Sequence, residues 1–312
     1  MGADIAHEKC GTSAEAPRIR RVDSSVVSNV SVVIISKKEQ GLSETLNSIE
    51  ASPIGESCEV VVVDASQGSL SAIRDAHPRI RWIDFPPIPN RSVTIPHQRN
   101  MGVASAKGEI IAYTDAGCVP EAEWLERLIQ PIIDGDEEFV AGPVKLDGSP
   151  YPPISRGAYV SECPTINVAF KKSVWTTLGG FDESFLYGSD IDFSWRAVQS
   201  GIRIRWVEDA VVSHDWGSWR RQLRRSYVYG VAKTKLYRKH PGRWKALFTT
   251  DPGPLAYACA LLGAPLGIIF PSYFLILAIP LWRNRRSEQP LLAVLNGFVF
   301  SIGAMIELVN PT

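Results

Sequence analysis

Short apolar runs alternate with amphipathic stretches through the first half of the chain. The runs are rich in β-branched residues, have the length of buried strands, and span 30–36, 58–64, 79–85 and 109–113. Apolar side chains at helical spacing lie between and after them, over 41–51, 70–76, 99–106 and 121–133. Strands that alternate with helices predict an α/β fold with a doubly wound, mostly parallel sheet.

The second half continues this pattern less regularly. We predict strands over 165–170, 202–207 and 210–213, and helices over 171–178 and from Ser189 or Asp190 to Ser200. Glycines are expected to end three helices. Gly108 suits the left-handed position after helix 99–106, the pair Gly179–Gly180 breaks the next one, and Gly201 stops the last.

Two of the predicted strands end on an aspartate, Asp64 and Asp115. Open α/β sheets bind ligands at the carboxyl ends of their strands, so both carboxylates are candidate site residues. A turn role is the alternative, because glycines follow both within four residues. The sequence contains neither GxGxxG nor GxxxxGK[ST], which disfavours a dinucleotide site and a P-loop. Bound phosphates would then need another neutralising group, and a divalent metal is the obvious candidate.

A second acidic pair, Asp190 and Asp192, falls in the first turn of a predicted helix. Negative charge is favourable there, so both could simply stabilise the helix start. The functional alternative is that one carboxylate faces a cleft as a general base. His214 directly follows the last predicted strand. A lone histidine is more often structural, but this one stands where the folded body ends.

Charge is divided unevenly along the chain. The 33 basic and 33 acidic residues cancel, yet residues 216–250 contain ten Lys and Arg and no acid. At 100° per residue, one side of a helix here carries Arg220, Arg221, Arg224 and Arg225, and the adjacent side carries Trp216, Trp219, Leu223 and Tyr227. This division is typical of a helix at a membrane interface. A solvated basic face and a nucleic-acid patch are the alternatives.

The last sixty residues decide between these interpretations. Residues 255–282 contain no charge and, as one helix, would measure about 42 Å at ~1.5 Å per residue, more than a bilayer core of ~30 Å. Three prolines interrupt this stretch, and the charged segment RNRR (283–286) separates it from a second uncharged stretch, 289–306. We therefore expect a membrane-bound chain with a cytoplasmic catalytic body, an anionic membrane surface as partner and no nucleic-acid partner. A hairpin turning near Pro271, followed by one span, would keep RNRR cytoplasmic.

Several segments together resemble the family 2 glycosyltransferases, which have the GT-A fold. The resemblance extends from Val30 to about Asp215, and the matching segments, in order, are VSVVIIS, CEVVVVDAS, QRNMGVASAKGEIIAYTDAGC, NVAF, LGGFDESFLYGSDIDFSWR and VVSH. It divides the chain into a flexible tail (1–29), a GT-A domain (30–215), basic aromatic interfacial helices (216–250) and membrane-embedded helices (251–312).

The resemblance implies roles for particular residues on the donor side. Ser36 and Glu39 lie where the family contacts the nucleoside. Asp64 matches the aspartate that binds the base, and Arg99 lies near the same pocket. Asp115 matches the first acid of the DxD motif, which holds the metal and the ribose.

Two further roles concern chemistry. Asp190 matches the second position of the ED motif, the general base, and His214 matches a histidine that often completes the metal site. The sequence departs from the family twice, since the DxD motif reads Asp115-Ala116-Gly117 and the ED motif reads Ser189-Asp190. The missing second acid weakens the expected Mg²⁺ or Mn²⁺ site.

The resemblance implies an inverting glycosyltransferase that moves a sugar from a nucleotide-sugar donor to a hydroxyl acceptor. The position of the site beside a membrane indicates a lipid-linked or membrane-delivered acceptor, as in cell-envelope glycan or glycolipid synthesis. One alternative is a sugar nucleotidyltransferase, which would need a glycine-containing basic loop where Lys37–Lys38 stands. Another is a membrane-anchored binding module without activity, against which the intact Asp115 and Asp190 argue.

Overall fold

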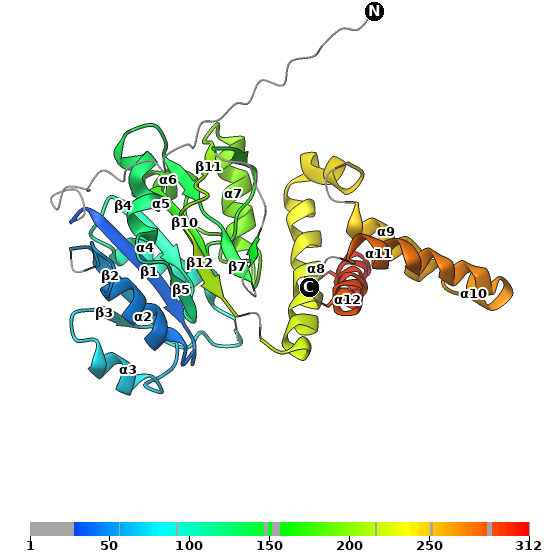
Figure 1. The fold of residues 1–312 in the computed structure, drawn as a ribbon, viewed down its shortest axis with the longest axis horizontal. Coiled ribbons are helices and arrows are strands. Elements are labelled where there is room, and N and C mark those ends of the chain that lie inside the picture. Colours follow the sequence, from blue (N-terminus) through cyan, green and yellow to red (C-terminus); the bar gives the residue numbers. More distant parts are fainter. Residues whose placement is uncertain are drawn as a thin grey trace, which may run out of the picture.

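The computed structural model describes residues 28–311 except 56, 92, 147–148, 152–156, 216, 250–251 and 286–288. Most of the predicted tail (1–29), together with Trp216 and part of RNRR, therefore lies outside the described residues. Figure 1 shows two parts, an α/β body and a group of C-terminal helices, with the long helix α8 between them.

The α/β body is built on an eight-stranded sheet of order β3-β2-β1-β4-β10-β6-β11-β9. Its strands are β1 (Val30–Ser36), β2 (Glu59–Asp64), β3 (Arg81–Asp84), β4 (Ile110–Thr114), β6 (Phe139–Ala141), β9 (Tyr159–Val160), β10 (Asn167–Lys171) and β11 (Ile204–Trp206). The first four pair in parallel, as predicted. Strand β10 runs antiparallel to both β4 and β6, so the sheet is mixed, with its parallel half at the β3 edge.

Helices cover both faces of this sheet because side chains along β1 alternate between two cores. Val32 and Ile34 pack with helices α2 (Leu42–Glu50) and α5 (Trp124–Ile133). Val33 packs on the other face with α4 (Ile95–Ser105), α6 (Lys172–Leu178) and α7 (Ser189–Gln199). A short helix, α3 (Ser71–Ala76), leads into β3. The doubly wound architecture was therefore predicted correctly.

A second, four-stranded sheet of order β5-β12-β7-β8 was not predicted. Its strands have three residues each, namely β5 (Cys118–Pro120), β7 (Val144–Leu146), β8 (Ser149–Tyr151) and β12 (Val212–His214). The predicted strand 210–213 overlaps β12, but the other three runs carry too little periodicity to be recognised. The sheet matters because β5 begins three residues after Asp115, and β12 ends on His214.

The glycine predictions have mixed outcomes. Gly179, Gly180 and Gly201 have positive φ values of 72°, 77° and 85°, as a helix stop requires. The left-handed prediction for Gly108 is wrong. A Cβ at position 108 would stand 2.7 Å from the Asn29 carbonyl oxygen, so this glycine permits a close approach of two backbone segments.

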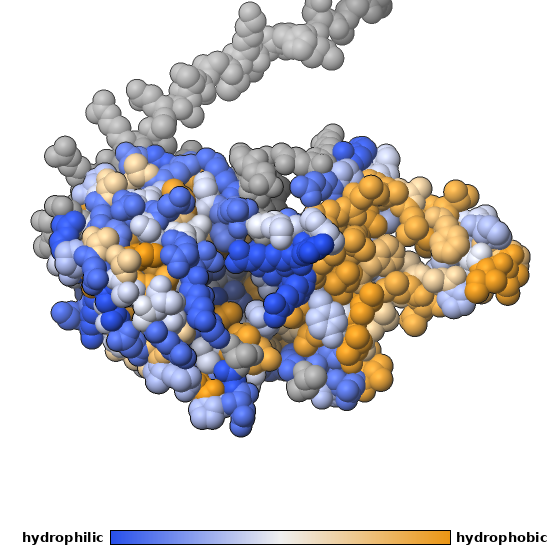
Figure 2. Space-filling view, turned by 90° about the horizontal axis from the view of Figure 1, so that it is seen from below, coloured by the Kyte–Doolittle hydropathy of each residue, from blue (hydrophilic) through white to orange (hydrophobic). Residues whose placement is uncertain are grey.

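The C-terminal part consists of helices with mostly apolar surfaces, and Figure 2 shows apolar residues gathered on this side of the molecule. After α8 (Trp219–Lys239) come the elements η1 (Pro241–Leu247), α9 (Gly253–Leu262), α10 (Leu266–Ile269), η2 (Pro271–Leu277), α11 (Ala278–Arg283) and α12 (Pro290–Val309). The chain folds back after α10, where the Tyr273 hydroxyl donates a 2.9 Å hydrogen bond to the Ala260 carbonyl. Among the described residues, α12 is the one helix long and apolar enough to cross a membrane.

Candidate active site

Ser36 and Asp64 lie side by side at the carboxyl ends of β1 and β2, where the parallel register pairs them directly. Asp64 is buried, and its Oδ1 accepts a 2.8 Å hydrogen bond from the Ser66 backbone N–H. The Ser36 hydroxyl is also buried, and it has no hydrogen-bond partner among the described residues. A buried polar group without a partner is costly, so this hydroxyl marks a place where a ligand could supply one.

Asp115 follows β4 on the neighbouring strand and is partly buried. Burial raises the pKa of its carboxyl group, and the nearby Asp190 carboxylate raises it further. The positive charges of Arg99, His214 and Arg225 oppose this rise. These couplings show that side chains from α4, α7, β12 and α8 converge on the end of β4.

Asp190 is held at the start of α7 by Arg99. One guanidinium nitrogen of Arg99 donates to the Ser189 hydroxyl at 2.9 Å, and the other lies 3.6 Å from the Asp190 carboxylate. The helix begins after Gly188, whose φ is +84°, and no side chain caps it by a hydrogen bond. Asp190 and Asp192 nevertheless both lie in the first turn of α7, as the helix-start alternative predicted. Asp190 Oδ1 accepts a 3.0 Å hydrogen bond from the adjacent Ile191 N–H, and Oδ2 is the oxygen that lies toward Arg99.

His214 reaches the site because β12 pairs antiparallel with β5, which places it opposite Cys118. Its Nδ1 lies 3.4 Å from the Cys118 sulfur. Burial lowers the pKa of the His214 imidazole, Asp115 opposes this shift, and Arg225 and Arg221 reinforce it. The ring is therefore neutral near pH 7, the form in which an imidazole nitrogen can bind a metal.

Helix α8 supplies residues that the sequence assigned to the membrane. Arg221 lies 3.6 Å from the Glu39 carboxylate, and Arg225 is close enough to affect Asp115 and His214. Tyr229 follows at the same four-residue spacing, and its ring meets Tyr187 edge-on at 6.4 Å between centroids. Arg221 and Arg225 thus have contacts with the α/β body that the interfacial-helix prediction did not include, and their position at a membrane stays a prediction. Their i, i+4, i+8 spacing could have shown from the sequence that Arg221, Arg225 and Tyr229 lie on one face of the helix.

The glycine in the shortened DxD motif lies against Glu39. Gly117 has a φ of +89°, and a Cβ there would be 3.5 Å from Glu39 Cγ. Within the described part of the chain, no group of three or more His, Cys, Asp and Glu could hold a metal ion. Asp115 and His214 remain as one carboxylate and one neutral imidazole. This donor set fits a divalent cation that takes its other ligands from a bound diphosphate and water.

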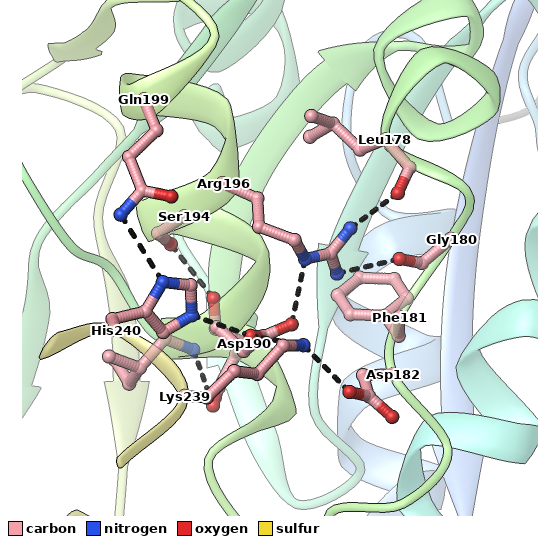
Figure 3. A network of polar contacts seen from close by, with 12 residues as sticks. Leu178, Gly180, Phe181, Asp182, Asp190, Ser194, Arg196, Gln199, Lys239 and His240 are labelled. Atoms are coloured by element: carbon pink, nitrogen blue, oxygen red, sulfur yellow. Dashed lines mark hydrogen bonds and ion pairs between the residues drawn. The ribbon is translucent and has the colours of Figure 1, made fainter. Parts of the chain in front are cut away.

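Asp192 has a different role from Asp190, two residues away. Its carboxylate is fully buried. One oxygen accepts a 2.8 Å hydrogen bond from Arg196 Nε, and the other lies 2.8 Å from His240 Nε2. Lys239 Nζ lies 2.7 Å from the same carboxylate and 2.6 Å from Asp182. Figure 3 shows Arg196, Lys239 and His240 converging between α7 and the end of α8. Asp192 therefore fastens α8 to the α/β body.

Comparison with known families gives two matches that together extend over most of the chain. The model of glycosyl transferase family 2 matches residues 31–178, and the model of glycosyl transferase family group 2 matches residues 155–299. The second match includes α8, α9 and part of α12, so both parts of the molecule have counterparts in this group of families.

Among curated proteins, the chain is similar to the pre-mycofactocin glycosyltransferase of Mycobacterium tuberculosis, with 29% identity over 192 residues. That alignment covers 54% of this chain and 40% of the relative. It is also similar to glycosyltransferase AglE of Haloferax volcanii, with 22% identity over 158 residues, covering 45% of this chain and 50% of the relative. The chain thus spans half the length or less of these curated relatives.

Solved structures show the same fold. The mannosyltransferase PcManGT from Pyrobaculum calidifontis, solved with GDP-Man and Mn²⁺, superposes with a TM-score of 0.66 at 18% identity, over 91% of this chain and 88% of that one. Residues 1–349 of TarS from S. aureus superpose with a TM-score of 0.53 at 15% identity, over 90% and 91% of the two chains. The architecture is therefore GT-A-like, and the chain belongs to the family 2 glycosyltransferases.

Proposed function

We propose that the protein transfers a sugar from a nucleotide-sugar donor to a hydroxyl acceptor, with inversion at the anomeric carbon. The observation that carries this proposal is the convergence of Asp190, Asp115 and His214 at the carboxyl edge of the sheet. The donor nucleoside would lie over Ser36, Glu39, Asp64 and Arg99. The unpartnered Ser36 hydroxyl and the buried Asp64 carboxylate support that position.

The base of the reaction is Asp190. It removes the proton of the acceptor hydroxyl, and the resulting oxygen attacks the anomeric carbon from the face opposite the diphosphate. The bond between that carbon and the diphosphate oxygen breaks, and a single displacement inverts the configuration. The Arg99 guanidinium lies 3.6 Å from Asp190 and holds this carboxylate at the start of α7.

The negative charge on the departing diphosphate must be balanced. A divalent cation, Mg²⁺ or Mn²⁺, would be held by Asp115 and His214 and would supply positive charge at the leaving group. Arg225 lies near both residues and Arg221 near Glu39, so α8 can contribute charge to the same space. Two protein ligands alone predict weak metal binding in the absence of the nucleotide.

The acceptor is proposed to be membrane-delivered. The long apolar helix α12 and the exposed apolar residues of α9 to α11 support a membrane position for the C-terminal part. The catalytic body would then stand at the cytoplasmic surface with α8 between it and the bilayer. This position favours an acceptor that is itself anchored in the membrane, as in cell-envelope glycan or glycolipid synthesis.

The test is a thermal-shift panel of nucleotide sugars, measured with and without Mn²⁺ on the full chain in detergent. One nucleotide sugar should raise the unfolding temperature, more so with the metal, and the same compound should be slowly hydrolysed. Stabilisation without any hydrolysis or transfer would favour the non-catalytic binding module. Release of inorganic diphosphate from a nucleoside triphosphate and a sugar phosphate would favour the nucleotidyltransferase.

A further inference from the structure

A cavity of about 360 Å³ lies where α8, α9 and α12 meet. Its lining is mostly apolar and includes the aromatic rings of Tyr229, Tyr257 and Phe300, together with three polar side chains, Ser226, Lys233 and Asn296. Apolar walls with a few polar groups are the usual composition of a small-molecule site. The Asp115 and Asp190 carboxylates are not part of this lining.

Two of the helices around the cavity, α8 and α12, pack closely against each other. A Cβ at Gly230 of α8 would stand 1.9 Å from the Phe300 carbonyl oxygen, and one at Gly303 of α12 would stand 2.2 Å from the Tyr227 carbonyl oxygen. The Ser226 hydroxyl donates a 2.9 Å hydrogen bond to Asn296 across the same contact. Glycines therefore hold α8 and α12 together beside the cavity, and α9 completes its lining.

Tyr229 connects the cavity with the active site. Its ring lines the cavity and also meets Tyr187, in the loop that leads into Asp190. Lys233, one turn further along α8, lies 3.4 Å from Glu162 and over the ring of Trp195, both in the α/β body. The side of α8 that borders the cavity is therefore also the side that contacts the catalytic elements.

The elements that follow α9 carry an apolar surface. Side chains of α10 and η2 are largely exposed, with Ile268 86% and Leu275 73% accessible, and Figure 2 shows the apolar area that they belong to. A ligand that spans from this surface to Asp190 must be apolar at one end and carry a hydroxyl at the other. Among acceptors, an amphiphile with a hydrocarbon chain meets both conditions.

We infer that this cavity binds the hydrocarbon chain of an amphiphilic acceptor and directs its hydroxyl end past Tyr229 to Asp190. The inference rests on the glycosyl transfer proposed above and specifies its acceptor class. Tyr257 and Phe300 contact the chain, whereas Ser226, Lys233 and Asn296 mark the polar boundary at which the headgroup begins.

The test uses a long-chain primary alcohol with a diazirine near the end of its tail, added to the full chain in detergent. After irradiation, mass spectrometry should locate the label on peptides from α8, α9 and α12 around Tyr229, Tyr257 and Phe300. An excess of the same alcohol without diazirine should abolish this labelling. Unsaturable labelling spread over the equally apolar α10–η2 surface would overturn the inference.

Substitutions that fill the cavity give a second readout. Phe300→Trp and Ser226→Leu enter it from different helices, and each should remove most of the saturable labelling, because the larger side chain occupies the space of the hydrocarbon chain. Val309→Trp, on the exposed end of α12, is the matched control and should label like the wild type. Unchanged labelling in both filling variants would contradict the assignment.

Nucleoside diphosphate binding, measured on the same samples, separates this inference from the proposed function. It should be unchanged in Phe300→Trp and Ser226→Leu, which also shows that these variants are folded. Saturable labelling in a protein that neither binds nor hydrolyses any nucleotide sugar would contradict the transfer and leave the cavity assignment in place. Transfer to a soluble acceptor with no chain-length dependence would contradict the cavity assignment alone.

Discussion

The carboxyl edge of the sheet and helix α8 bring opposite charges to the same space. The edge presents Asp64 and Asp115, and α8 presents Arg221 and Arg225. A row of carboxylates alone would repel a nucleoside diphosphate, so the edge is incomplete without a source of positive charge. If the edge binds a nucleoside diphosphate as proposed, the helix next to the apolar C-terminal part supplies positive charge to the active site.

The largest effect is expected from substitution of the proposed base, Asp190, at the carboxyl edge of the sheet. Asp190→Asn is nearly isosteric and keeps an oxygen that can accept from the Ile191 N–H, so the fold should persist. The amide cannot take up the acceptor proton, and turnover should fall about 10²–10⁴-fold. Kinetics and calorimetry of donor binding on the same protein would show it.

Donor affinity should change little in Asp190→Asn, because the carboxylate faces the acceptor. Asp136→Asn, in an exposed turn, is a suitable control and should turn over like the wild type. Normal turnover in Asp190→Asn would mean that the base is a different residue.

Asp192→Asn is expected to have the next largest effect. It tests whether activity requires the contact between α8 and the α/β body. Removal of one charge from a buried ion-paired group costs about 3–5 kcal/mol. Since Arg196, Lys239 and His240 all contact this carboxylate, α8 should detach more readily from the body. Limited proteolysis before α8 should become faster, and turnover should fall together with it.

An Asp192→Asn protein that resists protease like the wild type yet is inactive would assign this residue to the chemistry.

Asp182→Asn offers a milder comparison, because its contact with Lys239 is more exposed. Burial would raise the pKa of Asp182, but hydrogen bonds from Lys239 and Ser184 outweigh it and lower the pKa to about 2. The stabilising contribution of this carboxylate is therefore present above pH ~4 and is lost as the pH falls toward 2.

Asp115→Asn tests the metal at the sheet edge. The remaining candidate ligand, His214, cannot hold a hard cation alone, so Mn²⁺-dependent binding of the nucleoside diphosphate should be lost. The loss should exceed the roughly 10–100-fold effect typical of changes around a metal ligand. Calorimetry with and without Mn²⁺ would measure it, and equal affinity in mutant and wild type would make Asp115 a turn residue.

The smallest effects separate the four arginines of α8. Arg221→Gln and Arg225→Gln should each weaken diphosphate binding about tenfold, the magnitude of one hydrogen bond to a charged group. Arg220→Gln and Arg224→Gln should leave it unchanged and instead reduce the gain in activity on anionic vesicles. Each basic residue near such a surface contributes about 1 kcal/mol of membrane affinity. If both pairs of variants changed diphosphate binding and vesicle-dependent activity equally, all four arginines would be assigned to the membrane surface.

The sequence by itself determined the framework of the fold and several of its candidate site residues. The β-branched runs that became β1, β2 and β4 are continuous and bounded by polar residues, so their ends, at Ser36, Asp64 and Asp115, could be located within one or two residues. The bounds of α7 (Ser189–Gln199) were also predicted closely, with Ser189 or Asp190 at its start and Gly201 as its stop. These features depend on neighbours along the chain, where periodicity and turn chemistry act directly.

Only the tertiary structure decided which face of a helix meets which partner. The amphipathic pattern of α8 showed that its two sides differ, but membrane lipid and the α/β body both accept such a helix. Burial of Asp192 among Lys239, His240 and Arg196, and packing of Gly230 and Gly303 against α12, select one orientation. In the same way, the pairing of β12 with β5 brings His214 toward Asp115 through contacts between segments far apart in sequence. No local pattern records such contacts, because their free energy exists only once both segments are folded and packed.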